Sequence, residues 1–107
     1  MGRPVESLRE RLTVKTLEFE DDYTWVDSLL SIVFHVDVDD RRIECRVSQK
    51  TLNDYYRTTD SKEQAIVNFV EHRKTIVDIV SRMITLDDFD DEGNILITNA
   101  VCRRYNF

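Results

Sequence analysis

The feature that most constrains this chain is a long run of helical periodicity from about Ser61 to Leu86. Ser61 and Gln64 have the form of a capping box, in which a serine side chain caps the first turn. Behind them apolar residues recur every three or four positions, as on the buried face of a helix: Ile66, Phe69, Val70, Ile76, Val77, Val80, Met83 and Ile84. We expect one long helix of roughly 36 Å. Val67 and Ile79 fall off this stripe, which predicts a second covering surface, either the N-terminal segment or a partner subunit.

A β-hairpin is predicted between Ile32 and Val47. Apolar and polar residues alternate on both sides of Asp39–Arg42, so each strand has one buried face. The residues expected to face the core are Ile32, Phe34, Val36, Val38, Ile43, Cys45 and Val47. The polar residues 39–42 are expected to form a four-residue loop, although the usual Asn-Gly or Asp-Gly turn is missing.

Shorter elements are expected around this hairpin. Residues 17–20 alternate as a half-buried strand should, and Trp25 is expected to fold back as a cover for the core. Ser48 is a suitable N-cap for a two-turn helix whose Leu52, Tyr55 and Tyr56 share one face. Residues 95–98 read as a short strand that returns to the hairpin.

These elements predict an α+β fold. We expect a three-stranded, or four-stranded, antiparallel sheet with one short and one long helix packed on one face. Residues 17–98 would form a single domain of a size that can bury its own core. Residues 1–16 would be an N-terminal arm or short helix, and residues 99–107 a C-terminal tail or last half-turn.

Several short patterns in a fixed order resemble a known family. They are Leu17-Glu-Phe-Glu-Asp, the Trp25 segment, Ile43-Glu-Cys-Arg-Val-Ser, Phe69-Val-Glu-His-Arg-Lys-Thr-Ile and Asp91-Glu-Gly-Asn-Ile-Leu-Ile-Thr. Over about residues 17–98 the chain resembles a family of small bacterial proteins known only as domain of unknown function 1488. The resemblance implies a three-stranded antiparallel sheet with packed helices, and it implies no activity.

Charge and composition limit the classes of partner that this chain is expected to bind. The formal net charge of the 107 residues is −6, which argues against a domain that holds nucleic acid mainly by phosphate contacts. Residues 16–40 carry acids without Lys or Arg, whereas in residues 41–58 basic residues outnumber the acids. Cross-strand pairing explains these blocks most simply, and a bipolar partner-binding surface is the alternative. No apolar run of membrane-spanning length occurs, the start lacks the apolar core of a signal peptide, and the two cysteines form no recognisable motif. We therefore expect a cytoplasmic protein that does not contact membranes.

The strongest candidates for a ligand or partner site are His72 and Arg73, because Arg73 interrupts the apolar stripe of the predicted helix. A charge there needs a partner or a route to water. These two residues, with Arg46 and Tyr55, could hold an anionic ligand or a carboxylate of a partner. Alternatively, Arg73 pairs with an acid of the sheet, and His72 covers the sheet edge.

A metal site is weakly indicated at Asp88, Asp90 and Glu92, which resemble the opening of a calcium loop. The twelfth position of that loop is Asn99, where a bidentate Glu is required. An acidic turn in which Gly93 supplies a positive φ is the preferred interpretation. Cys45 should be an inert inward-facing thiol, whereas Cys102 could be activated by Arg103 and Arg104 but has no base in its motif. We predict no cofactor and no metal.

Three functions remain open. The leading hypothesis is a non-catalytic binding or regulatory domain that acts through a protein partner or as a homodimer. The second is a small nucleic-acid-binding protein that uses the strip from Arg41 to Arg57 and the pair Arg103-Arg104, with Tyr55 and Tyr56 as stacking platforms. The third is a small-molecule site or enzyme around His72 and Arg73, which would need a pocket there. The absence of a catalytic motif favours a binding protein over an enzyme.

Overall fold

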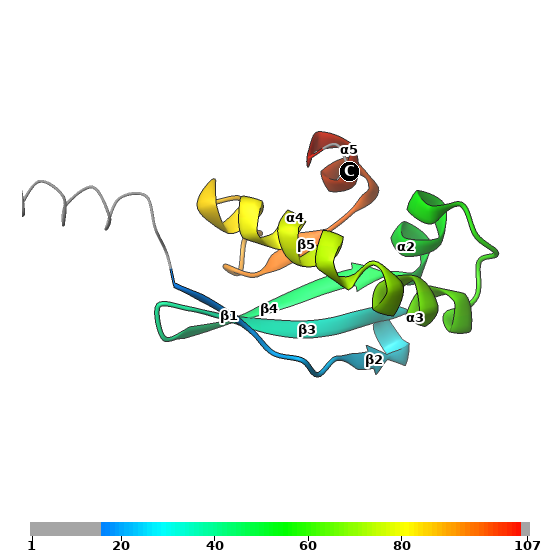
Figure 1. Cartoon of the computed structure of the whole chain (residues 1–107), viewed down its shortest axis with the longest axis horizontal. Helices are drawn as coiled ribbons and strands as arrows, with labels where there is room; N and C mark the ends of the chain where they lie inside the picture. Colours follow the sequence, from blue (N-terminus) through cyan, green and yellow to red (C-terminus); the bar gives the residue numbers. More distant parts are fainter. Residues whose placement is uncertain (1–15, 106–107) are drawn as a thin grey trace, which may run out of the picture.

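Four α-helices lie on one side of a five-stranded mixed sheet in the computed structural model, which describes residues 16–105 (Figure 1). The strands are β1 (Leu17–Phe19), β2 (Thr24–Val26), β3 (Ser31–Val38), β4 (Arg41–Ser48) and β5 (Ile95–Ile97). The helices are α2 (Gln49–Tyr56), α3 (Lys62–Glu71), α4 (Arg73–Thr85) and α5 (Asn99–Tyr105), with a 3₁₀ turn η1 (Asp27–Leu29) after β2. The α+β class is confirmed.

The predicted hairpin is formed by β3 and β4, which pair along their whole length from Ser31↔Ser48 to Val38↔Arg41. The inward face is as expected, since the residues predicted to face the core are all buried, and on the other face Val33 is buried as well. The predicted four-residue loop is wrong, because the turn consists of Asp39 and Asp40 alone. Both have positive φ, 51° and 72°, which is the signature of the type I′ turn. Two aspartates therefore adopt a conformation for which Asn-Gly is the usual sequence.

The predicted count of three or four strands and the predicted purely antiparallel arrangement are wrong, because the sheet has five strands and one parallel pair. A short strand, β2, pairs Trp25 with Ile32 at the edge of β3 beyond β1, and Trp25 packs against the core as expected. At the other edge β5 runs parallel to β4, with Cys45 opposite Ile95. Parallel neighbours need a crossover connection, and here α2, α3 and α4 supply it. Three apolar residues in sequence do not indicate whether a strand runs parallel or antiparallel to its neighbour.

The predicted single long helix is two helices. The backbone leaves helical geometry at His72, with φ −111° and ψ 25°, so that α3 ends at Glu71 and α4 begins at Arg73. The apolar stripe continues through the break, as Phe69, Ile76 and Val80 are all buried, but Val70, predicted on the same stripe, is 52% exposed. Periodicity could not reveal it, because the spacing of the buried residues is unchanged. The cap is as expected, since Ser61 Oγ accepts from the Gln64 amide at 3.1 Å, although the Gln64 side chain bonds Asn68 instead of closing the box.

The C-terminal residues are more ordered than a tail or half-turn. Asn99–Tyr105 forms α5, which buries Val101, Cys102 and Tyr105 against the core. Ile79 is covered by its own chain, with 1% of its surface exposed, whereas Val67 remains 43% exposed. The second covering surface therefore stays a prediction for Val67, which the described residues leave exposed. The predicted N-terminal arm lies outside them, except for Thr16.

Candidate functional site

A groove of about 640 Å³ opens between the end of α2 and α5. Six residues line it: Asp54, Tyr55, Tyr56, Arg57, Asn99 and Arg103. We call it the Tyr–Arg groove. Its volume falls in the range of roughly 300–1,000 Å³ typical of small-molecule sites. The groove unites two parts of the sequence that were each noted for basic and aromatic residues.

A buried amide network holds the α2 side of the groove in place. Asn53, 1% exposed, donates to Asp60 Oδ1 at 3.1 Å and to the Ser61 carbonyl at 3.0 Å. Its own Oδ1 accepts from Asn68 Nδ2 at 3.0 Å and from Thr58 Oγ1 at 3.2 Å. A buried polar network that satisfies its members is rigid. It therefore fixes α2, the loop 57–61 and α3 relative to one another.

Arg57 ends α2 in the left-handed conformation, with φ 58° and ψ 49°. Its N–H bonds back to the Asn53 and Asp54 carbonyls, as at a helix C-terminus that usually ends in glycine. The guanidinium is exposed and has no ion-pair partner among residues 16–105. A long basic side chain thus occupies a position where the backbone favours glycine. Arg103 of α5 is likewise exposed and without an ion-pair partner in the described chain.

Asp54 links the two walls of the groove. Its Oδ2 accepts from Lys50 Nζ at 3.0 Å and from Asn99 Nδ2 at 3.2 Å. The hydrogen bond from Lys50 and then that from Asn99 lower the pKa of Asp54. Because both bonds favour the ionised form, the carboxylate is a poor proton acceptor, and its negative charge is offset by Lys50.

Two polar atoms of the groove are buried and unpaired within the described structure: Tyr55 Oη and Asn99 Oδ1. The bond from Asn99 Nδ2 to Asp54 defines the orientation of the amide, so its oxygen is left as an acceptor. A buried polar atom without a partner costs about 1–3 kcal/mol. These two atoms have almost no exposed surface, so a ligand in the groove can pair with them only where neighbouring side chains move aside.

The tyrosine pair forms the aromatic part of the groove. The rings of Tyr55 and Tyr56 meet edge to face, with centroids 5.0 Å apart and an interplanar angle of 81°. His72 stacks on Tyr56 at 3.8 Å and 8°, at the break between α3 and α4. Burial, followed by the charge of Tyr55, raises the pKa of Tyr56 to about 12. Both hydroxyls therefore remain protonated near neutral pH.

The sequence candidates do not form one site. His72 reaches the rim of the groove through Tyr56, and Tyr55 lines it. Arg73 instead crosses to the connection between β1 and β2, where it donates to the Asp21 carbonyl at 2.7 Å and to the Glu20 carbonyl. Arg73 also lies over the ring of Phe69. Its hydrogen bonds go to backbone carbonyls rather than to the expected acid side chain.

Arg46 lies on the opposite face of the sheet from the helices, because it alternates with the buried Cys45 and Val47. It pairs with Glu44 at 3.5 Å, and its Nε is buried without a partner in the described chain. The basic strip is therefore divided: Arg42 pairs with Glu20 near the hairpin turn, and Arg57 lines the groove. Arg104 turns away from Arg103 to Asp88, at 2.6 Å.

The acidic turn after α4 is held by protein donors. Asp88 Oδ2 accepts from Arg104 and from the Tyr105 hydroxyl, and Asp90 Oδ1 accepts from the Glu92 and Asn94 amides, both at 2.9 Å. Gly93 has φ 81°, which confirms the turn that the sequence predicts. The part of the chain that the structure describes contains no cluster of three potential metal ligands.

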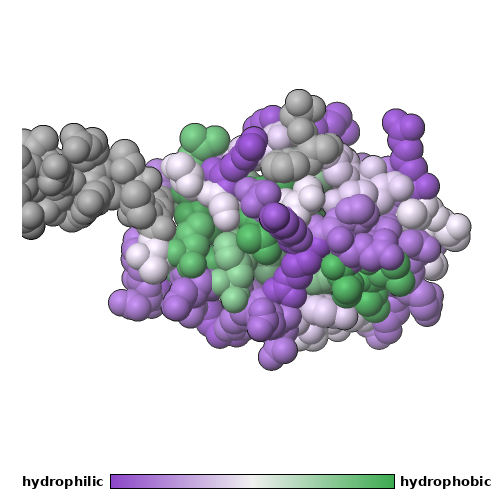
Figure 2. All heavy atoms as spheres, in the orientation of Figure 1, coloured by the Kyte–Doolittle hydropathy of each residue, from purple (hydrophilic) through white to green (hydrophobic). Residues whose placement is uncertain are grey.

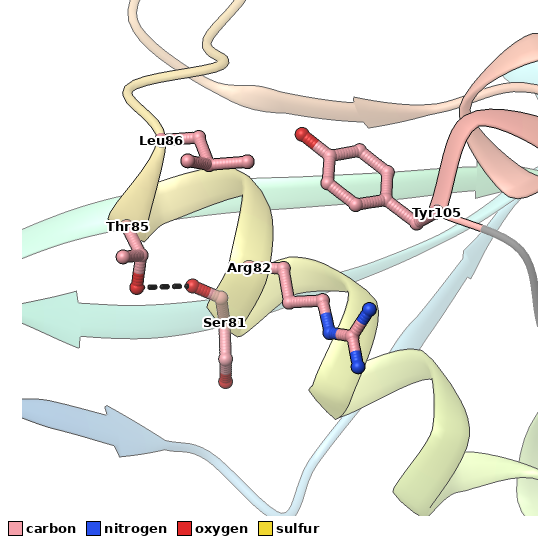
Figure 3. Close-up of a pocket in the computed structure, with 5 residues that line it drawn as sticks. All are labelled: Ser81, Arg82, Thr85, Leu86 and Tyr105. Carbon is pink, nitrogen blue, oxygen red and sulfur yellow. Dashed lines mark hydrogen bonds between the residues drawn. The ribbon is translucent and has the colours of Figure 1, made fainter.

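A second cavity, of about 340 Å³, lies between the end of α4 and α5 (Figure 3). Leu86 and the Tyr105 ring face each other across it, and the Thr85 hydroxyl is bonded to the Ser81 carbonyl at 2.9 Å. Its charged residue, Arg82, already has an interaction within the chain. This cavity offers apolar contact and little to orient a ligand, so the Tyr–Arg groove is the stronger candidate.

Sequence reasoning missed the amides that build the groove. Asn53 and Asn68 are buried polar residues on predicted helices, and a polar residue on an apolar stripe is the local signal that could have found them. Asn99 had been considered only as a failed calcium ligand. Its contact with Asp54 joins residues 45 positions apart, and no local sequence pattern predicts it.

Within residues 16–105, no helix combines the length and apolarity needed to cross a membrane.

Comparisons with known proteins agree with this fold. The model of a family described as "Protein of unknown function (DUF1488)" matches residues 17–97. A crystal structure of a DUF1488 protein of unknown function from Shewanella loihica PV-4 is similar, with a TM-score of 0.70 and 26% identity. The similarity covers 78% of this chain and 93% of that one. No curated protein matches. The resemblance noted in the sequence is therefore confirmed: the chain belongs to the DUF1488 family of proteins of unknown function.

Proposed function

We propose that this chain is a non-catalytic binding domain and that it takes an anionic ligand in the Tyr–Arg groove. The observation that carries the proposal is that Arg57 and Arg103 line one groove without ion-pair partners in the described chain. Arginine pairs with carboxylate and phosphate through two parallel hydrogen bonds, which gives both affinity and orientation. The acids of residues 16–40 do not line this groove, so the local field favours an anion despite the net charge of −6.

The chemistry of the groove supports binding rather than catalysis. Asp54, its acid, is engaged by Lys50 and Asn99. The nearby thiol of Cys102 is buried, and burial raises its pKa while Arg103 lowers it less. A nucleophile needs a lowered pKa or an adjacent base, and neither thiol meets that condition, since burial and then Glu44 raise the pKa of Cys45 to about 12.

Solution NMR of the full chain tests the proposal. Inorganic pyrophosphate and a glutamate-rich peptide would be titrated at low ionic strength, where charge pairs are least screened. We expect amide shifts on α2 and α5 that disappear in the double variant Arg57→Gly/Arg103→Ala. Arg41→Ala, which removes one positive charge at the start of β4, should leave them unchanged. The absence of groove shifts with these anions, and with the nucleotides considered below, would reject the proposal.

Contact with a protein partner or a second copy of the chain is the second candidate. Val67 and Val70 are 43% and 52% exposed on one face of α3, and Figure 2 shows apolar surface gathered over this helix. Sedimentation over a concentration series tests the homodimer. Dimerisation that is lost in Val67→Glu would support it, and a monomer at high micromolar concentration would remove it.

We also propose a cytoplasmic location, supported by two cysteines that are both free and buried. Reduced thiols are typical of reducing compartments.

A further inference from the structure

We infer that the anion bound in the Tyr–Arg groove is a nucleotide, that is, a planar nitrogen base joined through a sugar to phosphate. The inference rests on the proposed function and names its ligand class. Two features of the groove, its arginines and its tyrosines, each suit a different part of such a ligand.

The arginines require the phosphate. Arg57 comes from the C-terminal end of α2 and Arg103 from α5, so the two cations reach the groove from different elements. Planar guanidinium groups match the oxygens of phosphate. A long nucleic acid would also meet the acids of a chain with net charge −6, whereas a single nucleotide meets only the groove. A mononucleotide therefore suits the charge distribution better than a polymer.

The tyrosines require the base. Two aromatic rings line the groove at right angles to each other. His72 occupies one face of Tyr56 at 3.8 Å, so a base would stack on Tyr55 or on the remaining surface of Tyr56. Nucleobases stack favourably on aromatic side chains, whichever base is present. Phosphate alone or a carboxylate makes no use of these rings.

Asn99 and Tyr55 each carry an unpaired polar atom buried behind the groove surface, and a ligand that displaces the neighbouring side chains can pair with it. Asn99 Oδ1 can only accept, and the Asn99 amide is oriented by its bond to Asp54. The oxygens of a fully ionised phosphate donate nothing, but every common nucleobase carries an N–H or NH₂ group. The Tyr55 hydroxyl can donate to a base or sugar oxygen. A peptide also supplies N–H donors, but it lacks the planar ring that the tyrosines favour.

Isothermal titration calorimetry of the full chain tests the inference with the four nucleoside 5′-monophosphates. Inorganic phosphate, adenosine and a glutamate-rich peptide are the comparison ligands. We expect at least one nucleotide to bind with a Kd below 1 mM, and at least tenfold more tightly than phosphate or adenosine. Tyr55→Phe, which deletes only the unpaired hydroxyl, should weaken binding about fivefold. Arg103→Ala should weaken it about tenfold. Tyr23→Phe and Arg41→Ala are the matched controls, since both residues lie away from the groove, and they should bind as the parent does.

The outcomes separate this inference from the proposed function. If phosphate, pyrophosphate or the peptide binds the groove as tightly as any nucleotide does, the nucleotide inference is wrong and the anion site stands. If no anion binds, both are wrong. Nucleotide binding that none of the groove substitutions weakens would also overturn the inference. Circular dichroism of each variant shows whether it is folded, and Tyr55→Phe keeps the ring, so this variant tests the site without removing its packing.

Discussion

Replacing Arg57 by glycine should make the protein more stable while it weakens the binding site. Arg57 has φ 58°, in the left-handed region, where an L-residue is disfavoured by about 1–2 kcal/mol. Glycine removes that cost but adds roughly 0.5–1 kcal/mol of backbone entropy to the unfolded state. The net expectation is a gain of about 0.5–1 kcal/mol in the free energy of unfolding. Losing the exposed guanidinium should cost little, because it has no ion-pair partner in the described chain.

Urea denaturation at 25 °C measures this change. With an m value on the order of 1.5 kcal/mol/M, the midpoint of Arg57→Gly should rise by about 0.5 M. Arg57→Ala is the matched control, because it removes the same charge but keeps the Cβ, and its midpoint should stay close to that of the parent. Both variants should bind anions more weakly. A glycine variant that is no more stable than the alanine variant would refute the conclusion that Arg57 is strained.

Three further predictions concern the scaffold. Asn53→Ala should lower the free energy of unfolding by about 2–4 kcal/mol in urea titrations, because it removes four side-chain hydrogen bonds of a buried amide. Gln49→Ala, which removes an exposed bond to the same Asp60, should cost under about 0.5 kcal/mol. Asp40→Gly should raise the free energy of unfolding by about 0.5–1 kcal/mol, since φ is 72° there, and an unchanged urea midpoint would argue against strain in the turn. The unfolded thiol of Cys45 ionises near its ordinary pKa of 9.0 and the folded one near 12, so the native state binds more protons and stability should fall as pH rises above about 9. The Cys45→Ala variant should show a shallower fall between pH 9 and 10.5, and an equal slope would contradict the assignment.

The local elements were determined by the sequence. Alternation between Ile32 and Val47 specifies the hairpin, because a slip of one residue would expose its apolar face. Ser48 and Ser61 specify the starts of α2 and α3 through their own side chains, each accepting from the amide three residues on. Gly93 specifies the acidic turn. In each case the interacting residues are close in sequence or repeat with a fixed period, so a linear pattern contains the information.

Tertiary structure alone decided the rest. The break at His72 leaves the apolar period intact, and the parallel direction of β5 depends on the helices that precede it. The sequence allowed Arg73 to be a ligand-binding residue, but in the folded chain it donates to a backbone carbonyl of the connection between β1 and β2. The Tyr–Arg groove joins α2 to α5 across 45 positions through Asp54 and Asn99. A contact at that distance leaves no periodic trace in the sequence, because it depends on how complete helices pack and not on the spacing of residues within one.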